Sequence, residues 1–193
     1  RVVRPVQGGV LYDLDGGRRL LEAALKAARF SRGTAPQLVL AISSQPSALE
    51  RDAWMTLARE AGAREVYLTS QVIAAAVGAG MDILVPKARL VVHIGSGQCE
   101  VGVVSLGHCL YARSLRLGGE DLTVALREHI RCQHKFLIDR QDAEKIKHEL
   151  DLDCGEECTV TVSGRLLEND QPVIRAISKQ QLSSVIPPQV ADW

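Results

Sequence analysis

A glycine-rich turn between two apolar runs is the part of this sequence best suited to chemistry. Residues 90–106 read LVVHIGSGQCEVGVVSL, so an apolar strand ends at Gly95, Ser96 and Gly97, and a second strand begins at Gln98. Because glycine has no Cβ, the backbone N–H groups of such a turn can approach an anion closely. The turn therefore predicts a phosphate-binding hairpin, although similar turns also join hairpins that bind no ligand.

The elements before this turn alternate between strands and helices. The apolar run over 37–42 predicts a strand that is buried on both faces. Ser47 and Glu50 have the spacing of a capping box, which opens a helix. A strand over 65–68 and an alanine-rich helix over 70–78 follow. This alternation predicts an α/β layer with a parallel component.

Helix boundaries and inner faces follow from glycine positions and from helical spacing. The pairs Gly8-Gly9 and Gly16-Gly17 are expected to bracket a short strand or turn, with a helix over 18–30 after them. The helix that Ser47 opens is expected to bury four side chains, those of Leu49, Trp54, Leu57 and Ala58.

The second half of the chain begins with strands that are joined by short links. Runs over 89–94, 98–106 and 109–117 predict an antiparallel sheet of three strands. A helix over 120–134 follows, and then a helix that Asp139 or Asp142 can cap and that ends near Leu150. Strands are predicted over 159–162 and 173–177, and Pro187-Pro188 would break a helix that begins at Ser178.

The glycine-rich turn resembles the second phosphate-binding hairpin of the actin, sugar-kinase and heat-shock-chaperone ATPase superfamily. The resemblance is greatest to the bacterial rod-shape-determining (MreB/Mbl-type) branch, whose pattern is Asp-Ile-Gly-Gly-Gly-Thr-Thr-Glu followed by an apolar strand and Ser-Leu-Gly. Residues 93–100 and 105–107 occupy that register here. Similar matches elsewhere have the same order as in the family and cover about residues 4 to 180; they lie at 4–10, 66–78, 115–126 and 143–149.

The resemblance implies a role for several residues. Gly95, Ser96, Gly97 and Gln98 would line the phosphates of a nucleotide through the amides of the turn. Glu144 and Lys147, one helical turn apart, would flank the ribose and adenine; the alternative is an ordinary exposed helix pair. Gln71 falls where the family places a residue that orients the attacking water, a task that an amide can perform; the alternative is a plain polar residue at a helix start.

Several departures from the family pattern concern catalysis. His93 stands where the family has an aspartate that holds the Mg²⁺ shell, and imidazole is a poor substitute for an oxygen ligand of that ion. Gln98 and Cys99 replace paired threonines, and Ser70 and Gln71 replace an acidic pair. Hydrolysis is therefore expected to be weak or lost, no metal ligands are assigned, and His93 can also be a plain strand-end histidine.

The implied fold class is a partial α/β actin-like (ribonuclease-H-like) ATPase fold, with mixed sheets flanked by helices and a small α+β subdomain. Residues 1–80 would belong to the first large subdomain, 81–117 to the phosphate hairpin of the second, 118–180 to a small subdomain, and 181–193 to the return. The first phosphate loop is expected before residue 1, and the Gly-Gly-Gly adenosine motif after Trp193. ATP or ADP with Mg²⁺ would then bind the full-length protein. The same nucleotides would bind this stretch alone weakly or not at all.

Composition limits the remaining possibilities. The 193 residues have zero formal net charge and 4% aromatics, which argues against a nucleic-acid surface. Apolar runs are too short to predict a membrane span. Five cysteines at irregular spacing do not predict a disulfide framework, so reduced thiols are expected; a zinc site at Cys154, Cys158 and His148 is disfavoured because it lacks a clear second pair.

The resemblance implies a cytoplasmic, membrane-associated filament subunit that binds ATP, assembles head to tail and helps determine cell shape. Its other expected partners are the inner membrane surface and proteins of cell-wall morphogenesis. Phe30 is the candidate membrane contact; the alternative is that Phe30 is a half-buried loop residue. Two alternatives remain open. One is a pseudo-ATPase scaffold that keeps the fold without turnover. The other is a sugar-kinase-type phosphotransferase, for which no catalytic carboxylate stands out.

Overall fold

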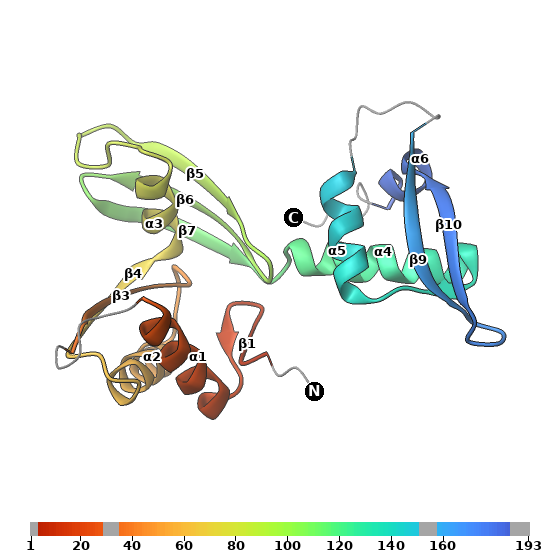
Figure 1. Ribbon diagram of the computed structural model, residues 1–193. Coiled ribbons are helices and arrows are strands. Elements are labelled where there is room, and N and C mark those ends of the chain that lie inside the picture. The colour runs from red at the N-terminus through yellow and green to blue at the C-terminus, as the bar shows by residue number, and fades with distance from the viewer. Residues whose placement is uncertain (1–3, 29–34, 151–157, 186–193) are drawn as a thin grey trace. The chain divides into compact units, whose positions relative to one another are not determined.

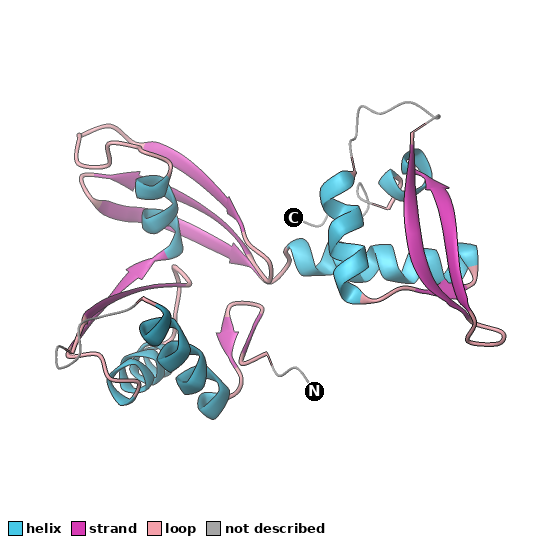
Figure 2. Ribbon diagram, in the orientation of Figure 1, coloured by secondary structure: helices cyan, strands magenta, loops and turns pink. Residues whose placement is uncertain are grey.

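The computed structural model describes residues 4–28, 35–150 and 158–185. The chain divides into two compact units, Arg1–Arg116 and Leu117–Trp193 (Figure 1). Each unit contains both helices and strands (Figure 2). The assignment of these segments to the subdomains expected from the sequence stays a prediction.

The first unit opens with a hairpin and an α/β layer. Strand β1 (Val6–Gln7) pairs antiparallel with β2 (Val10–Leu11), and helix α1 (Leu14–Ala27) follows. Strands β3 (Gln37–Ile42) and β4 (Glu65–Ser70) pair in parallel, as the alternating pattern predicts. Helix α2 (Ala48–Glu60) connects them, and Leu21 of α1 packs against Leu57 and Ala58 of α2.

Three details of this layer differ from the sequence prediction. Helix α1 begins at Leu14, since the Asp13 side chain accepts a hydrogen bond from the Gly16 amide at 3.0 Å and caps the helix there; Gly16 and Gly17 are thus helical. Leu49 is 79% exposed because α2 turns the opposite face toward the core. Strand β3 is not buried on both faces, since Val39 is 65% exposed.

The rest of the first unit is a three-stranded antiparallel sheet covered by one helix. Strands β5 (Arg89–Ile94), β6 (Cys99–Ser105) and β7 (His108–Leu115) pair in sequence order, which confirms the prediction. Helix α3 (Gln71–Gly78), capped by Ser70, lies across one face of this sheet (Figure 1). An added Cβ on Gly102 of β6 would lie 2.7 Å from Val72 Cγ1, so glycine permits this close packing.

The second unit packs helices against another antiparallel sheet. Helix α4 (Gly119–His134) is followed by β8 (Phe136–Leu137) and by α5 (Arg140–Glu149), which Asp139 caps. Strands β9 (Thr159–Leu166) and β10 (Pro172–Ser178) pair antiparallel, and α6 (Lys179–Ser183) comes last. The core contains Leu126, Ile130, Phe136, Ile177 and Leu182, all fully buried or nearly so. Pro187-Pro188 lies outside the described residues.

Cysteine chemistry differs in part from the sequence prediction. Cys158 is disulfide-bonded, so the expectation of reduced thiols is wrong at that position, whereas Cys99, Cys109 and Cys132 take part in no disulfide bond. Spacing along the chain could not reveal the bond because pairing depends on distance in the fold. Among the described residues, no group of three or more histidine, cysteine or acidic side chains is arranged to hold a metal ion. Within those ranges, too, no helix combines the length and apolar character that crossing a membrane requires.

Candidate phosphate-binding site

Two glycine turns that are far apart in sequence meet in the first unit. The turn between β5 and β6 closes with a hydrogen bond of 2.9 Å from the Gly95 amide to the Gln98 carbonyl. The turn between β1 and β2 holds Gly8 and Gly9 at φ +54° and +76°, a region that glycine enters readily. An ideal Cβ on Gly97 would lie 3.0 Å from the Gly8 amide nitrogen, so the two backbones are nearly in contact.

A small polar pocket adjoins the two turns. Its volume is about 200 Å³. That is below the 300–1,000 Å³ typical of sites for whole small molecules, and is suited to a group as small as a phosphate. Arg116 supplies a positive charge, and Glu50, whose pKa is lowered by hydrogen bonds from the Ser47 amide and hydroxyl, supplies a negative one. The lining residues are Gly8, Gly9, Val10, Ser43, Gln45, Glu50, Gln98, Ser114 and Arg116.

A buried carboxylate, Glu100 on β6, organises the polar residues behind this pocket. Its side chain is fully buried. One oxygen accepts from the Ser43 hydroxyl at 2.9 Å, the Ser44 amide at 2.8 Å and the Ser114 hydroxyl at 2.7 Å, and the other accepts from the Ser44 hydroxyl at 2.7 Å. Burial alone would raise the pKa of Glu100, but these donors outweigh it and the pKa is lowered. Glu100 is thus a buried, ionised acceptor that joins three segments.

Two of the sequence-predicted residues meet beside Glu100. Gln98 is 5% exposed, and its side-chain Nε2 donates to Gln71 Oε1 at 2.7 Å and to Glu100 Oε1 at 3.3 Å. Gln71, the predicted water-orienting residue, is the first residue of α3 and is half-buried. The structure therefore joins Gln71 to the glycine turn between β5 and β6 through Gln98, although the two residues are 27 positions apart.

His93 lies on the same sheet face as Glu100, because the two residues are partners in the β5–β6 register. Its Nε2 would lie 3.5 Å from a Cβ on Gly95, so the imidazole packs near the turn. A Mg²⁺ ion prefers oxygen ligands, and the oxygens of Glu100 already accept hydrogen bonds from protein groups. The residues at this turn fit a phosphate group and do not fit direct Mg²⁺ coordination.

Glu144 and Lys147 lie together on α5, in the second unit. Lys147 Nζ donates to Glu144 Oε1 at 2.6 Å, to the Gly119 carbonyl at 3.0 Å and to Thr123 Oγ1 at 3.2 Å. The Lys147 hydrogen bond lowers the pKa of Glu144, and Thr123, which is fully buried, also donates to that carboxylate at 2.9 Å. These contacts join α5 to the first turn of α4; the assignment of both residues to ribose and adenine stays a prediction.

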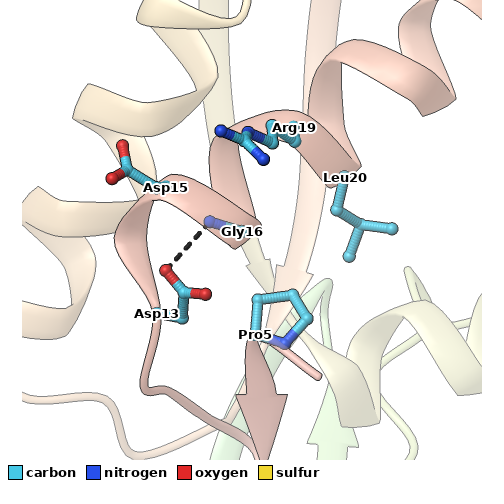
Figure 3. A pocket seen from close by; sticks show the side chains of 6 residues that line it. All are labelled: Pro5, Asp13, Asp15, Gly16, Arg19 and Leu20. Atoms are coloured by element: carbon cyan, nitrogen blue, oxygen red, sulfur yellow. Dashed lines mark hydrogen bonds between the residues drawn. The ribbon is translucent and has the colours of Figure 1, made fainter. Parts of the chain in front are cut away.

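A second hollow lies at the start of α1 (Figure 3). It is an open depression of about 490 Å³ beside Pro5, Asp15, Arg19 and Leu20. Asp13 points to the Gly16 amide and is engaged in capping the helix (Figure 3). Its acidic side chain therefore has a structural role, and this hollow lacks the paired glycine turns of the other pocket.

Sequence reasoning missed the centre of the site. The sequence indicates Glu100 only as the last residue of the family pattern, and no pattern in it singles out Ser43, Ser44, Ser114 or Arg116. The Ser-Ser step that follows an apolar strand was a usable signal, because polar residues at the carboxyl end of a strand in an open α/β sheet often line a ligand site. Phe30, the predicted membrane contact, lies outside the described residues.

Comparison with known proteins gives the family and the fold. Residues 1–192 match the MreB/Mbl protein family. The cell shape-determining protein MreB of Escherichia coli is 34% identical over 151 residues, which are 77% of this chain and 43% of that protein. Mbl of Bacillus subtilis, also a cell shape-determining protein, is 25% identical over 98% of this chain and 58% of its own. The chain thus spans about half the length of the curated relatives it matches.

Solved structures agree with this match. MreB5 of Spiroplasma citri bound to ADP superposes with a TM-score of 0.89 at 26% identity, over 100% of this chain and 58% of that one. The same protein bound to AMPPNP gives 0.88. The subunit of the MamK double helical filament, at 17% identity, gives 0.75 and shares the fold. This chain therefore belongs to the MreB/Mbl family and has the actin-like fold.

Proposed function

We propose that this chain is part of a nucleotide-binding subunit of an actin-like filament that helps determine cell shape. The observation that carries the proposal is the pocket that Gly8, Gly9, Gln98 and Arg116 line, next to the close approach of Gly97 to Gly8. Backbone amides and one guanidinium suit an anionic phosphate. Family membership supports the cellular role, since relatives are named for cell shape.

Nucleotide binding rests on specific groups of this chain. Ser96 and Gly97 do not line the pocket but directly precede Gln98, which does, and in the described ranges their amides donate no hydrogen bond to another residue. A phosphate at the mouth of the pocket would find these amides unoccupied. Gly97 keeps the two turns close, and Arg116 balances part of the added negative charge. The phosphates of the bound nucleotide would favour either the assembled or the disassembled state of the filament. A relative of this fold, MreB5, is described as bound to ADP and to AMPPNP.

Filament assembly follows from the family and from the symmetry of such subunits. Head-to-tail contacts use two different surfaces, and they produce filaments when the rotation between subunits does not close. MamK, which shares the fold, is described as a double helical filament. The proposed filament would lie in the cytoplasm under the inner membrane and organise cell-wall synthesis through self-contacts and morphogenesis proteins.

A pseudo-ATPase scaffold is the second candidate, and the contacts of Glu100 favour it. Glu100, which accepts a hydrogen bond from Gln98 of the turn, also accepts hydrogen bonds from Ser44 and Ser114, and His93 stands where an oxygen ligand is expected. Such a site holds a phosphate more readily than it assembles a metal-assisted hydrolytic centre. In this case the filament or scaffold would bind nucleotide without turnover.

Nucleotide titration of the complete protein tests the binding proposal. Arg116→Ala should weaken ADP and ATP binding about ten-fold or more, as expected for a lost charge-assisted contact. Arg113→Ala is the matched control, because Arg113 is exposed on β7 and does not line the pocket. Equal affinities for the wild type and both variants would remove Arg116 and this pocket from the proposal.

A further inference from the structure

The two hydroxyl groups that line the small polar pocket can act only as acceptors toward a ligand. Ser43 and Ser114 both line the pocket, and each donates its single hydroxyl hydrogen to Glu100 Oε1, at 2.9 and 2.7 Å. Because Glu100 is ionised, it cannot donate in return, so neither bond can be reversed. The serines therefore offer the pocket the lone pairs of their oxygens.

The side chain of Gln98 has the same polarity. Its Nε2 donates to Gln71 Oε1 at 2.7 Å and to Glu100 Oε1 at 3.3 Å, which assigns the other position of the carboxamide to oxygen. Gln98 Oε1 lies against Gly9, where an added Cβ would come within 1.6 Å of it. No described residue donates a hydrogen bond to this oxygen. Gln98 thus adds another acceptor to the lining of the pocket.

Glu50 adds an ionised acceptor. The amide and the hydroxyl of Ser47 both donate to Glu50 Oε2, at 2.7 and 2.9 Å, and these bonds lower the pKa of Glu50. Its other oxygen, Oε1, accepts from no residue in the described part of the chain. Since Glu50 and Arg116 are the two charged residues of the lining, their charges cancel. Hydrogen bonds, more than net charge, must therefore decide which anion the pocket takes.

A ligand of this pocket must both accept and donate hydrogen bonds. Arg116 and the amides of Gly8 and Gly9, which donate to no described residue, need an acceptor. The serine oxygens, the Gln98 oxygen and the Glu50 carboxylate need a donor. Hydrogen phosphate meets both demands, because its bare oxygens accept and its P–OH group donates. Sulfate has a similar size but carries no proton at neutral pH, so its oxygens would meet these lone pairs with no hydrogen between them.

We propose that this pocket selects a phosphate group that carries a proton, and that Glu50 is the specificity-determining residue that accepts its hydrogen bond. The inference rests on the proposed phosphate site and adds which phosphates that site takes. Two sources share this chemistry, free inorganic phosphate and the terminal phosphate of a nucleotide. Inorganic phosphate retains a proton throughout the neutral pH range. A terminal phosphate, like a phosphate monoester with a second pKa of about 6, retains one in only a fraction of the molecules.

Equilibrium binding of three small anions to the complete protein at pH 8 tests the selectivity. The anions are inorganic phosphate, sulfate and monofluorophosphate, which replaces P–OH by P–F and so keeps the phosphorus and the charge without the proton. We expect phosphate to bind about ten-fold or more tightly than the other two, since a site built around a ligand hydroxyl rejects the analogue that lacks it. Equal affinities for the three anions, or no binding of any of them, would overturn the inference without recourse to a variant.

Glu50→Gln reverses the polarity of one group in the lining. Because Glu50 Oε2 accepts both bonds from Ser47, the amide oxygen takes that position, the helix cap is kept, and an NH₂ group replaces Oε1. The ratio of phosphate affinity to sulfate affinity should fall to about one, mainly because sulfate gains a donor. Glu60→Gln, on the same helix but outside this pocket, is the matched control and should keep the wild-type ratio. A wild-type ratio in Glu50→Gln would remove Glu50 from the proposal.

A further titration in saturating ADP distinguishes the two sources of phosphate. If ADP displaces the bound phosphate, the terminal phosphate of the nucleotide shares this pocket; if phosphate stays bound, free phosphate is its ligand. Titration with ADP and ATP alone separates the inference from the proposed function. Nucleotide binding without preference for phosphate over sulfate would overturn the selectivity and leave the proposed function intact. Preference for phosphate without nucleotide binding would overturn the proposed nucleotide site and support the selectivity.

Discussion

The replacement Glu100→Gln is the sharpest stability test of the buried network. The substitution keeps the shape and removes the charge. With the amide oxygen in the Oε1 position, the bonds from Ser43, Ser44 and Ser114 remain, but each becomes a neutral bond. At Oε2, an N–H group replaces the acceptor of the Ser44 hydroxyl, which can rotate and accept instead.

The size of the effect follows from these bonds. A hydrogen bond to a charged group contributes about 1.5–3 kcal/mol and a neutral one about 0.5–1.5 kcal/mol, so three weakened bonds amount to ~3 kcal/mol. Relief from burying a charge offsets part of this loss. We expect a decrease of about 2 kcal/mol in the free energy of unfolding, within the range of disrupted buried networks.

Urea unfolding at pH 7, followed by the fluorescence of Trp54 in the first unit, measures this decrease. Glu60→Gln, on the exposed end of α2, is the matched control and should change stability by less than about 0.5 kcal/mol. If Glu100→Gln also stays within that limit, the carboxylate does not organise the site and the reasoning is refuted.

Three further predictions test neighbouring features. Because the pKa of Glu100 in the folded state lies below its usual 4.5, the stability that its charge contributes is full above pH 4.5 and is lost as the pH falls through the folded-state pKa. The free energies of unfolding of the wild type and Glu100→Gln, measured in urea, should therefore converge as the solution is acidified. A difference that stays constant with pH would contradict this. Gly9→Ala, at φ +76° and against Gln98, should cost about 1–3 kcal/mol in thermal unfolding, whereas Gly78→Ala, which meets open space at the end of α3, should be neutral or slightly stabilising. Lys147→Met should lower the melting temperature, because the Gly119 carbonyl and Glu144 lose their donor, and should do so more than Lys145→Met on the exposed face of α5; equal effects would argue against the α4–α5 tie.

Much of the fold was predictable because local rules act within a few residues. Ser47 and Glu50 form the capping box that their spacing predicts, and the three strands that surround Gly95 pair in order. Gly16 and Gly17 are helical, although the sequence prediction begins the helix only at residue 18, because a good N-cap at Asp13 outweighs the low helix propensity of glycine in a first turn. The exposure of Leu49 was not predictable from helical spacing, because tertiary contacts determine which face of its helix is buried.

The candidate site was predictable only in part. Glycine spacing predicts a phosphate-binding turn, and a resemblance to a family predicts the role of Gln71; both stay predictions. The approach of Gly8 to Gly97 could not be predicted, since no local pattern relates residues so far apart in the chain. The same holds for Glu100, whose charge is stable in the core only because Ser44 and Ser114 arrive from other segments.

High-speed sedimentation of the complete protein with ATP, with ADP and without nucleotide, alongside phosphate release, tests the central claim most directly. We expect pelleting that depends on nucleotide, with little phosphate released. Failure to pellet under any condition, with no nucleotide bound, would contradict a nucleotide-controlled filament subunit and leave only the actin-like fold.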